Sequence, residues 1–415
     1  MTKSKEYPSL RFSGFTDAWE QRKLEDFGEA TGGTSLEAEF VENGKFKVIN
    51  IGSYSEDSTY RDQGLRVNLS EKTKNRLLNR GDLTMILNDK TASGNIIGRV
   101  LLIEESNCYV YNQRTERIAV NSSEYDSLFL YTMLNAPNIR SKIIKQCQGN
   151  TQIYVNWSAI SKLSYLVPNI DEQKKTGQFF KTLDNLITLH QRKLENVQNI
   201  KKSCLQKMFP KNGEILPEVR FPEFSGAWEL RKLSDISNKV TQKNKDCEFS
   251  ETLTNSAEFG IISQNDFFDH RVSNEDNING YYIVGDNDFV YNPRISTSAP
   301  VGPINRNKLG RTGVMSPLYT VFKPHDVDYS YLEWFFKSSA WHSFMRFNGD
   351  SGARSDRFSI KDNVFFTMPI PLPTLKEQRK IGQFFQSIDN LITLHHRKLE
   401  NLQNIKKGLL QQMFI

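Results

Sequence analysis

The side chains in this 415-residue chain that could do chemistry are mainly hydrogen-bonding groups, and few of them suit acid–base catalysis. Six histidines are spread along the chain, with no HExxH, no GxSxG and no close His/Asp/Glu cluster. No GxxxxGK[ST] or GxGxxG loop offers a phosphate cradle. The Asn/Asp-Pro-Pro-aromatic tetrapeptide of amino-methyltransferases is missing, and Asn292-Pro293-Arg294 matches it only in part, as a strand-end turn would. We expect no catalytic residue and no cofactor bound by this chain.

Arginine, asparagine and glutamine gather instead in short loops, several of them beside glycine. These loops are 90–95, 112–114 and 148–152 in the first half, and 292–296, 346–349 and 351–357 in the second. Such side chains can pair with base edges and with phosphates, although any one loop could simply be a solvated turn.

Composition bounds the protein class. The four cysteines are scattered without a CxxC pair, which is typical of reduced thiols and predicts no metal site. No run of about 18 apolar residues predicts a membrane span, and no signal peptide is visible. The formal net charge of +6 comes from two stretches, 172–209 and 377–414, which carry +5 and +3, so the remainder carries −2. Nucleic-acid binding by that remainder would therefore need local basic patches.

The two basic stretches are copies of each other. Residues 172–209 and 377–414 are identical at 28 of 38 positions. A shorter duplication, 11–24 and 220–233, matches at nine of 14 positions, including Trp19 and Trp228, which we expect to be core anchors. Each half therefore opens with a tryptophan segment and closes with the long repeat. Internal repetition of this kind sets the architecture.

The variable regions between these markers predict mixed helix and strand. Strand patterns occur at Ile96–Ile103, Tyr109–Val120, Tyr281–Val284 and Leu318–Phe322. Helical patterns occur at Glu124–Leu134 and Tyr329–Met345. The last predicted element of each variable region is an apolar strand that ends at Pro168 or Pro373, shortly before the long repeat.

Each long repeat predicts a helix with a heptad seam. Apolar residues alternate at spacings of four and three for about four heptads, with no interrupting proline. The expected seam residues are Leu183, Ile187, His190, Leu194 and Val197 in the first copy and Ile388, Ile392, His395, Leu399 and Leu402 in the second. We expect the two histidines to form polar, register-setting positions rather than a metal site.

The seams predict that the two helices pair. A helix of 38 residues spans roughly 57 Å and cannot bury its stripe alone. The first helix ends where the second variable region begins, so a pseudo-twofold relation between the halves requires the second helix to return along the first. We therefore predict an α/β (α+β) protein with two similar globular domains and an antiparallel coiled coil. Lys201 and Lys406 on the seam would snorkel at its edge or face a partner helix.

The duplicated segments resemble a known family. The repeat EQxKxGxFF…DNLITLHxRKLEN…KKxxLQxMF looks like the conserved region of specificity subunits of type I restriction–modification systems. The Arg-Phe-x-x-Phe and Trp-Glu openings, and the exits that end in Pro and Glu-Gln, fit the same family. The resemblance covers the whole chain in order: a recognition domain at 1–168, a spacer helix at 169–212, a second domain at 213–373 and a second helix at 374–415.

The resemblance implies a non-catalytic subunit in which each domain reads one half of a bipartite double-stranded DNA target. It implies that the helices set the spacing and dock two methyltransferase subunits, that motor–nuclease restriction subunits join, and that S-adenosylmethionine, ATP and Mg²⁺ belong to those partners. A cytoplasmic location in a bacterium or archaeon follows. The candidate DNA-contacting residues are Lys90, Ser93, Asn95, Gln113, Arg114, Gln148, Asn150, Gln152, Tyr154, Arg294, Ser296, Arg346, Asn348, Arg354, Ser355 and Arg357.

Two other readings remain open from the residues alone. A coiled-coil adaptor would bind proteins, and its globular ends would lack affinity for duplex DNA and a steep salt dependence. A nuclease or methyltransferase with an unrecognised site would show activity as the isolated chain, with Mg²⁺ or S-adenosylmethionine.

Overall fold

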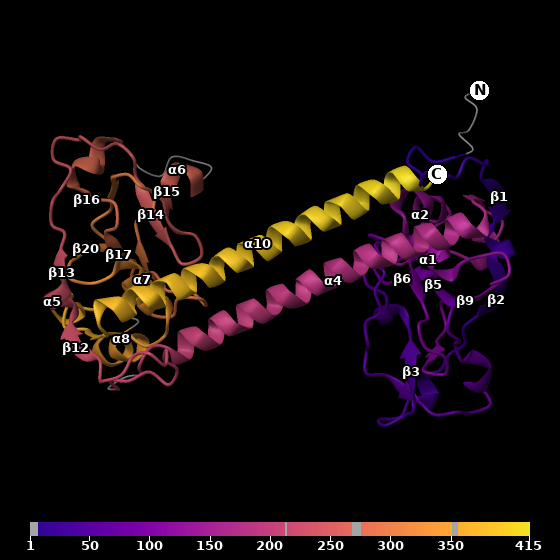
Figure 1. The fold of residues 1–415 in the computed structure, drawn as a ribbon, viewed down its shortest axis with the longest axis horizontal. Helices are drawn as coiled ribbons and strands as arrows, with labels where there is room; N and C mark the ends of the chain where they lie inside the picture. Colours follow the sequence, from indigo (N-terminus) through magenta and orange to yellow (C-terminus); the bar gives the residue numbers. More distant parts are fainter. Residues whose placement is uncertain (1–6, 212–213, 268–274, 351–355) are drawn as a thin grey trace. The chain divides into compact units, whose positions relative to one another are not determined.

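The computed structural model of the chain describes residues 7–211, 214–267, 275–350 and 356–415 (Figure 1). The chain divides into two compact units: unit 1 is Met1–Gln191 with Arg397–Ile415, and unit 2 is Arg192–His396. Each unit thus contains one variable region, the beginning of the long helix that follows it and the end of the other long helix. The internal duplication predicted from the sequence is present in the fold.

Unit 1 is a mixed helix–strand unit. Its strands are β1 (Glu20–Lys23), β2 (Gly28–Gly32), β3 (Phe46–Ile49), β4 (Arg66–Val67), β5 (Leu83–Ile86), β6 (Asn88–Asp89), β7 (Val100–Leu102), β8 (Tyr109–Tyr111), β9 (Thr115–Val120), β10 (Ile153–Tyr154) and β11 (Ser164–Val167). Its helices are the 3-10 turns η1 (Leu24–Phe27), η2 (Glu37–Glu39), η3 (Ile51–Ser53) and η4 (Lys74–Arg76), followed by α1 (Ser127–Asn135), α2 (Pro137–Ile144), α3 (Trp157–Ile160) and the start of α4 (Ile170–Lys207).

Unit 2 repeats this plan. Its strands are β12 (Glu229–Lys232), β13 (Ser237–Lys239), β14 (Leu253–Ser256), β15 (Gly260–Ser263), β16 (Tyr282–Val284), β17 (Phe289–Tyr291), β18 (Ile304–Arg306), β19 (Gly313–Met315), β20 (Thr320–Pro324) and β21 (Pro369–Leu372). Its helices are α5 (Leu233–Ile236), α6 (Gln264–Phe267), η5 (Glu275–Gly280), α7 (Tyr329–Lys337), α8 (His342–Asn348), α9 (Asp362–Phe365) and the start of α10 (Leu375–Met413).

The largest sheet and the pair of entry and exit strands correspond in the two units. A four-stranded antiparallel sheet has the order β2-β9-β5-β7 in unit 1 and β13-β20-β17-β18 in unit 2. The entry strand pairs with the exit strand in both units, as β1 with β11 and β12 with β21. In register, Leu83 lies opposite Ile118 in unit 1, and Phe289 lies opposite Phe322 in unit 2. Halves that share little variable-region sequence therefore share a topology.

Three predicted elements were wrong in detail. The stretch Tyr109–Val120 is two strands in different sheets, because Arg114 has a positive φ of 70° and turns the chain between β8 and β9. Within Ile96–Ile103 only Val100–Leu102 is strand, because Gly98 turns at φ +71° against Ile143. The helix predicted at Tyr329–Met345 is two helices, since Ser338 is extended after α7.

A glutamate–glutamine pair joins each long helix to its unit. The Glu172 carboxylate accepts two hydrogen bonds of 2.7 Å from the Arg11 guanidinium, and Glu377 accepts two of 2.7 Å from Arg220. The next residue, Gln173, accepts a hydrogen bond from the backbone N–H of Asp126, the residue just before α1. Gln173 also donates a hydrogen bond to the Pro168 carbonyl. Gln378 repeats both bonds with Asp328 and Pro373. The arginine near the start of each half and the Glu-Gln motif about 160 residues later therefore bind each other and attach the long helix to its unit.

The long helices run antiparallel in each unit, as predicted. In unit 1, Lys406 of α10 lies 2.5 Å from the Asp184 carboxylate of α4, and the rings of Phe180 and Phe414 are 5.8 Å apart. In unit 2, Lys201 lies 2.5 Å from Asp389, and the rings of Phe209 and Phe385 stack at 6.0 Å. The two seam lysines therefore form ion pairs across the helix pair.

Each core contains the end of the helix that arrives from the other repeat. In unit 1, Met413 and Phe414 are buried with Trp19, Phe129 and Phe180. In unit 2, the residues in the same places are Met208, Phe209, Trp228, Tyr331 and Phe385. Trp19 and Trp228 are 4% and 3% exposed, which agrees with their expected role as core anchors.

Candidate nucleic-acid interface

Three of the polar loops predicted in the first half lie side by side in unit 1, where β5 ends. The Leu87 N–H donates to the Arg114 carbonyl at 2.9 Å, and the Val155 N–H donates to the Leu87 carbonyl at 2.9 Å. Strand β6 pairs with β10, which places Asp89 opposite Ile153. The loops 90–95, 112–114 and 148–152 are thus held at one end of the four-stranded sheet, although their residues lie up to 62 positions apart along the chain.

The 90–95 loop is anchored from both sides by side chains that the sequence did not single out. The Asp89 carboxylate accepts hydrogen bonds from the Thr91 N–H, the Thr91 hydroxyl and the Ile96 N–H. From α2, the guanidinium of Arg140 donates to the carbonyls of Gly94, Asn95 and Ile97 at 2.7–2.9 Å. Burial lowers the pKa of Arg140 to about 10, so the group stays charged at neutral pH. The loop is therefore held in one conformation.

Within this loop the predicted residues differ in whether their side chains already form hydrogen bonds. Lys90 and Ser93 are exposed, and the Ser93 hydroxyl lies 2.7 Å from the Thr91 hydroxyl. The side-chain amide of Asn95 donates to the Glu56 carboxylate at 2.8 Å. Lys90 is thus the side chain of this loop best suited to a phosphate contact.

The tip between β8 and β9 presents Gln113 and Arg114. Asn112 is 5% exposed and orders the tip: its Oδ1 accepts from the backbone N–H groups of Leu36 and Gln113, and its Nδ2 donates to Glu37. The Gln113 side chain also donates to Glu37, at 3.3 Å. Arg114 adopts its left-handed conformation on the exposed tip, where such strain is often kept for function.

The two carboxyl groups around this tip differ in charge state. Hydrogen bonds from Ser35 and Asn112 lower the pKa of Glu37 to about 2, so Glu37 stays ionised and holds the tip. Burial raises the pKa of Glu116 to about 7, so Glu116 is part-neutral at neutral pH. Glu116 therefore repels a polyanion less than a fully ionised carboxylate would.

The third loop of unit 1 forms a tight turn. Gln148 and Tyr154 exchange backbone hydrogen bonds of 2.9 and 3.0 Å. Gly149 sits at φ +95°, and a Cβ there would lie 2.1 Å from the Gln152 carbonyl oxygen, so only glycine fits. The predicted residues Gln148, Asn150 and Gln152 are exposed on the turn, and Tyr154 is 38% exposed.

In unit 2 the corresponding loops also lie together. Arg294 and Arg357 are partners in an antiparallel bridge, and the Phe358 N–H donates to the Pro293 carbonyl at 2.7 Å. The end of α8 joins them, because Asp350 and Ser359 exchange backbone hydrogen bonds. Arg294, Ser296, Arg346 and Asn348 are exposed, and Arg357 is half-buried. The predicted residues Arg354 and Ser355 lie outside the described residues.

A buried amide network supports the 292–296 loop. Asn292 donates to the Asn255 carbonyl at 2.8 Å, and its Oδ1 accepts from the Arg294 N–H at 2.9 Å. Asn255, which is 1% exposed, donates to the Val290 carbonyl and accepts from Asn305. Beside this loop lies a cavity of about 350 Å³, which includes Tyr282, Tyr319 and Arg357 in its lining.

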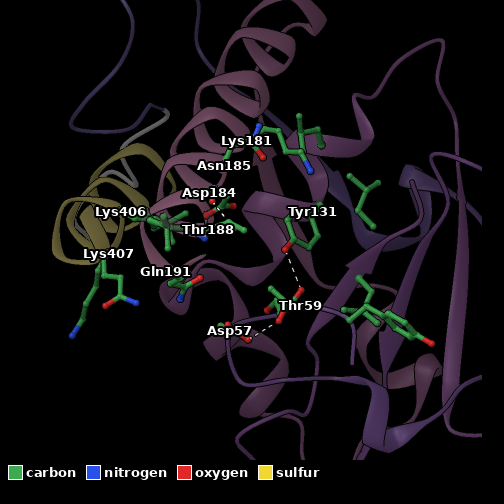
Figure 2. Close-up of a pocket in the computed structure, with 18 of the residues that line it drawn as sticks. Asp57, Thr59, Tyr131, Lys181, Asp184, Asn185, Thr188, Gln191, Lys406 and Lys407 are labelled. Carbon is green, nitrogen blue, oxygen red and sulfur yellow. Dashed lines mark hydrogen bonds and ion pairs between the residues drawn. The ribbon is translucent and has the colours of Figure 1, made fainter. Parts of the chain in front are cut away.

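In unit 1, a cavity of about 440 Å³ lies between the 57–60 segment, α1, α4 and α10. Figure 2 shows Asp184, Thr188 and Gln191 of α4 with Lys406 and Lys407 of α10 beside it, and Tyr131 and Thr59 across from them. The Tyr131 hydroxyl donates to the Ser58 carbonyl at 3.1 Å, and Lys406 is paired with Asp184. None of the candidate DNA-contacting residues lines this cavity, which belongs to the junction with the helix pair.

The candidate seam residues lie on the inner side of the helix pair. Leu183, Ile187, Leu194 and Ile388 are 6–9% exposed. His190, Val197, Ile392, His395, Leu399 and Leu402 are half-buried. Within the described residues no group of three or more metal-ligating side chains occurs, and no helix is long and apolar enough to cross a bilayer.

Each unit therefore presents polar side chains from converging loops, Arg, Gln and Asn in unit 1 and Arg and Asn in unit 2, and each contains parts of both long helices. The family model of the type I restriction modification DNA specificity domain matches residues 16–199 and again residues 226–404. The chain belongs to this family.

Individual relatives agree with this assignment. The type I restriction enzyme MjaVIII specificity subunit of Methanocaldococcus jannaschii is 23% identical over 353 residues, which cover 81% of this chain and 79% of that protein. The S subunit of a type I restriction-modification system from M. genitalium has a similar fold, with a TM-score of 0.60, 13% identity and 99% of each chain covered. The HsdS subunit from Thermoanaerobacter tengcongensis aligns with a TM-score of 0.50 and 14% identity over 95% of this chain and 96% of that one.

Proposed function

We propose that this chain is the DNA-specificity subunit of a type I restriction–modification complex, in which unit 1 and unit 2 each read one half of a bipartite duplex target. One observation carries the proposal: in both units, polar loops from distant parts of the sequence converge at the end of β5 or β17. A fixed array of Arg, Gln and Asn side chains is suited to base edges in the major groove, and neighbouring cations are suited to phosphates.

The proposal divides the chemistry between subunits. This chain would contribute recognition and no catalysis, which is consistent with the lack of a catalytic motif in its sequence. S-adenosylmethionine would be bound by two methyltransferase subunits, and ATP and Mg²⁺ by the restriction subunits. The complex would act in the cytoplasm of a bacterium or archaeon.

The long helices would set the gap between half-sites and dock the methyltransferase subunits. Leu186 and Leu189 of α4 are 42% and 45% exposed, and their counterparts Leu391 and Leu394 of α10 are 45% and 44% exposed. The two repeats thus keep leucines on a face that does not belong to the seam. Exposed apolar side chains that recur in both copies suit the core of a protein–protein interface.

Salt dependence of DNA binding tests the proposal. The full chain, in complex with its methyltransferase subunit, should bind duplex DNA with an affinity that falls steeply as salt rises. If the units together make about six phosphate contacts, affinity should drop about a thousand-fold between 50 and 200 mM salt. Fluorescence anisotropy with a labelled duplex measures this slope.

Two variants sharpen that experiment. Lys90→Ala, as a phosphate contact, should weaken binding to all duplexes alike and reduce the slope of log affinity against log salt by about one. Arg357→Ala should instead reduce discrimination at the second half-site, by about 1–3 kcal/mol if its contact is bidentate. A complex without measurable affinity for duplex DNA at low salt would favour the protein-binding adaptor.

A further inference from the structure

Phe347 breaks the amphipathic pattern of its helix. Trp341, the N-cap of α8, and Met345 within α8 are 2% and 0% exposed and face the core. Phe347 follows Met345 by two positions, which turns it about 200° around the helix axis. It is 90% exposed, and the next most exposed large apolar side chain among the described residues, Phe259, is 61% exposed. A helix selected only for folding would carry a polar residue at this position.

Packing holds the end of α8 in place. The Asn348 side chain donates to the Phe344 carbonyl, and the Gly349 N–H donates to the Met345 carbonyl, both at 2.8 Å. A Cβ on Gly349 would lie 2.5 Å from the Ser359 carbonyl oxygen, so the backbone here lies directly against the next segment. Phe347 is therefore presented from a supported helix end, which limits the entropy lost when it is covered.

The surroundings indicate what covers it. Arg346 precedes Phe347, and the segment that packs on Gly349 carries Arg357, whose bridge partner is Arg294. An exposed apolar side chain that follows an exposed arginine, on a helix end that packs against an arginine-bearing segment, suits a polyanion that also offers apolar surface, and a duplex offers both in its phosphates and stacked bases. Unit 1 has a similar pair where α2 ends, because Ile144 is 42% exposed and precedes the exposed Lys145.

We propose that Phe347 is an apolar wedge that contacts or partly enters a base step of the half-site read by unit 2, while Arg346 holds the adjacent phosphate. This inference rests on the proposed DNA-recognition function and adds a mode of reading to it. A wedge partly unstacks the step that it enters and kinks the duplex. Because pyrimidine–purine steps deform most easily, Phe347 selects such a step without hydrogen bonds to its bases.

The test compares Phe347→Ala with wild type in the complex of the full chain with its methyltransferase subunit. The target is first mapped as methylated adenine in cells that express both proteins, and duplexes of that sequence then carry 2-aminopurine at successive positions of the second half-site. Wild type should raise fluorescence at one step, and Phe347→Ala should abolish that rise. Affinity should fall roughly 5- to 150-fold, the range expected for base–aromatic stacking.

Three further variants complete the experiment. Phe347→Leu keeps an apolar wedge and should retain most of the signal, whereas Phe347→Gln should behave as Phe347→Ala does. Leu69→Ala removes a side chain in unit 1 that is 60% exposed and lies outside the candidate loops, so it should change neither readout. Since Phe347 is almost fully exposed, its variants should melt at the wild-type temperature.

The outcomes separate the wedge from the proposed function. Wild type that fails to bind duplex DNA contradicts the proposed function itself. Wild type that binds, with Phe347→Ala equal to it in affinity and in 2-aminopurine signal, overturns the wedge alone. Loss of the methyltransferase subunit from Phe347→Ala preparations, with DNA affinity kept, would overturn it in favour of a protein contact.

Discussion

Glu172→Ala should lower the free energy of unfolding of unit 1 by about 3–5 kcal/mol, the usual cost of removing one partner from a buried ion pair. The Glu172 side chain is 1% exposed and that of Arg11 is 13% exposed. The hydrogen bond to Glu172 raises the pKa of Arg11. A guanidinium stays protonated near neutral pH even without such a partner, so Arg11 remains charged after Glu172 is removed. A buried charge without a counter-ion is the physical reason for the large effect.

Unit 2 supplies the matched comparison. Glu377→Ala removes the same contact, but Arg220 also donates to the carbonyls of Gly226 and Ser225, so it keeps acceptors and should lose less stability. The double variant Arg11→Met/Glu172→Leu removes both charges and should lie much closer to wild type than Glu172→Ala does.

Hydrogen exchange of peptides from each unit, measured across a urea series, reads these effects separately. We expect faster exchange in unit 1 for Glu172→Ala and in unit 2 for Glu377→Ala. A loss below about 1 kcal/mol in unit 1, the range of exposed ion pairs, would show that the pair contributes no more than a surface contact.

Phe414→Ala should destabilise unit 1, and Phe209→Ala should destabilise unit 2, by about 3–5 kcal/mol each, because both remove a buried aromatic side chain and leave a cavity. Phe414 is 1% exposed, with its ring 5.6 Å from that of Phe129 and 5.8 Å from that of Phe180. Phe209 is 2% exposed and lies 5.7 Å from Tyr331 and 5.9 Å from Phe335. Each phenylalanine thus stabilises the unit that holds it.

The position of Phe209 along the chain makes this prediction specific. Phe209 follows the first variable region along the chain, so a simple two-domain reading would assign it to unit 1. Exchange should instead rise in peptides around α7 for Phe209→Ala, and around α1 for Phe414→Ala. Phe414→Leu keeps most of the buried volume and should cost much less. Faster hydrogen exchange in unit 1 peptides for Phe209→Ala would contradict the finding that the end of α4 belongs to the core of unit 2.

Much of this architecture could be predicted from sequence because it is repeated or periodic. The heptad spacing of residues such as Leu183 and Ile388 predicts the helix pair, and a pseudo-twofold relation between the two halves requires that the helices run antiparallel. The Glu-Gln motifs are visible as motifs, but their partners are not, since nothing in the sequence relates Glu172 to Arg11. Boundaries of the short strands were poorly predicted, because single residues such as Arg114 and Ser338 turn the chain there.

The candidate interface was predictable only as a set of loops. Their convergence depends on the short β6–β10 pairing, which carries no sequence signal. The residues that hold the loops, Arg140, Asp89 and Glu37, were missed for a related reason. Arg140 lies between Ile139 and Ile143 on a short helix, where periodicity alone does not distinguish a buried guanidinium from an exposed one. The assignment of individual residues to DNA, and the domain boundaries at 168, 212 and 373, remain predictions.

The most direct test of the central claim, that each unit reads one half-site, is exchange of one unit's variable region. Residues 213–373 are replaced by the equivalent region of another family member that keeps the arginine at the position of Arg220, so that its pairing with Glu377 is preserved. Methylated adenines are then mapped in cells that express the chimera with the cognate methyltransferase. We predict that one half-site changes while the other half-site and the gap stay as in wild type. A target in which both half-sites change, or neither does, would contradict the account.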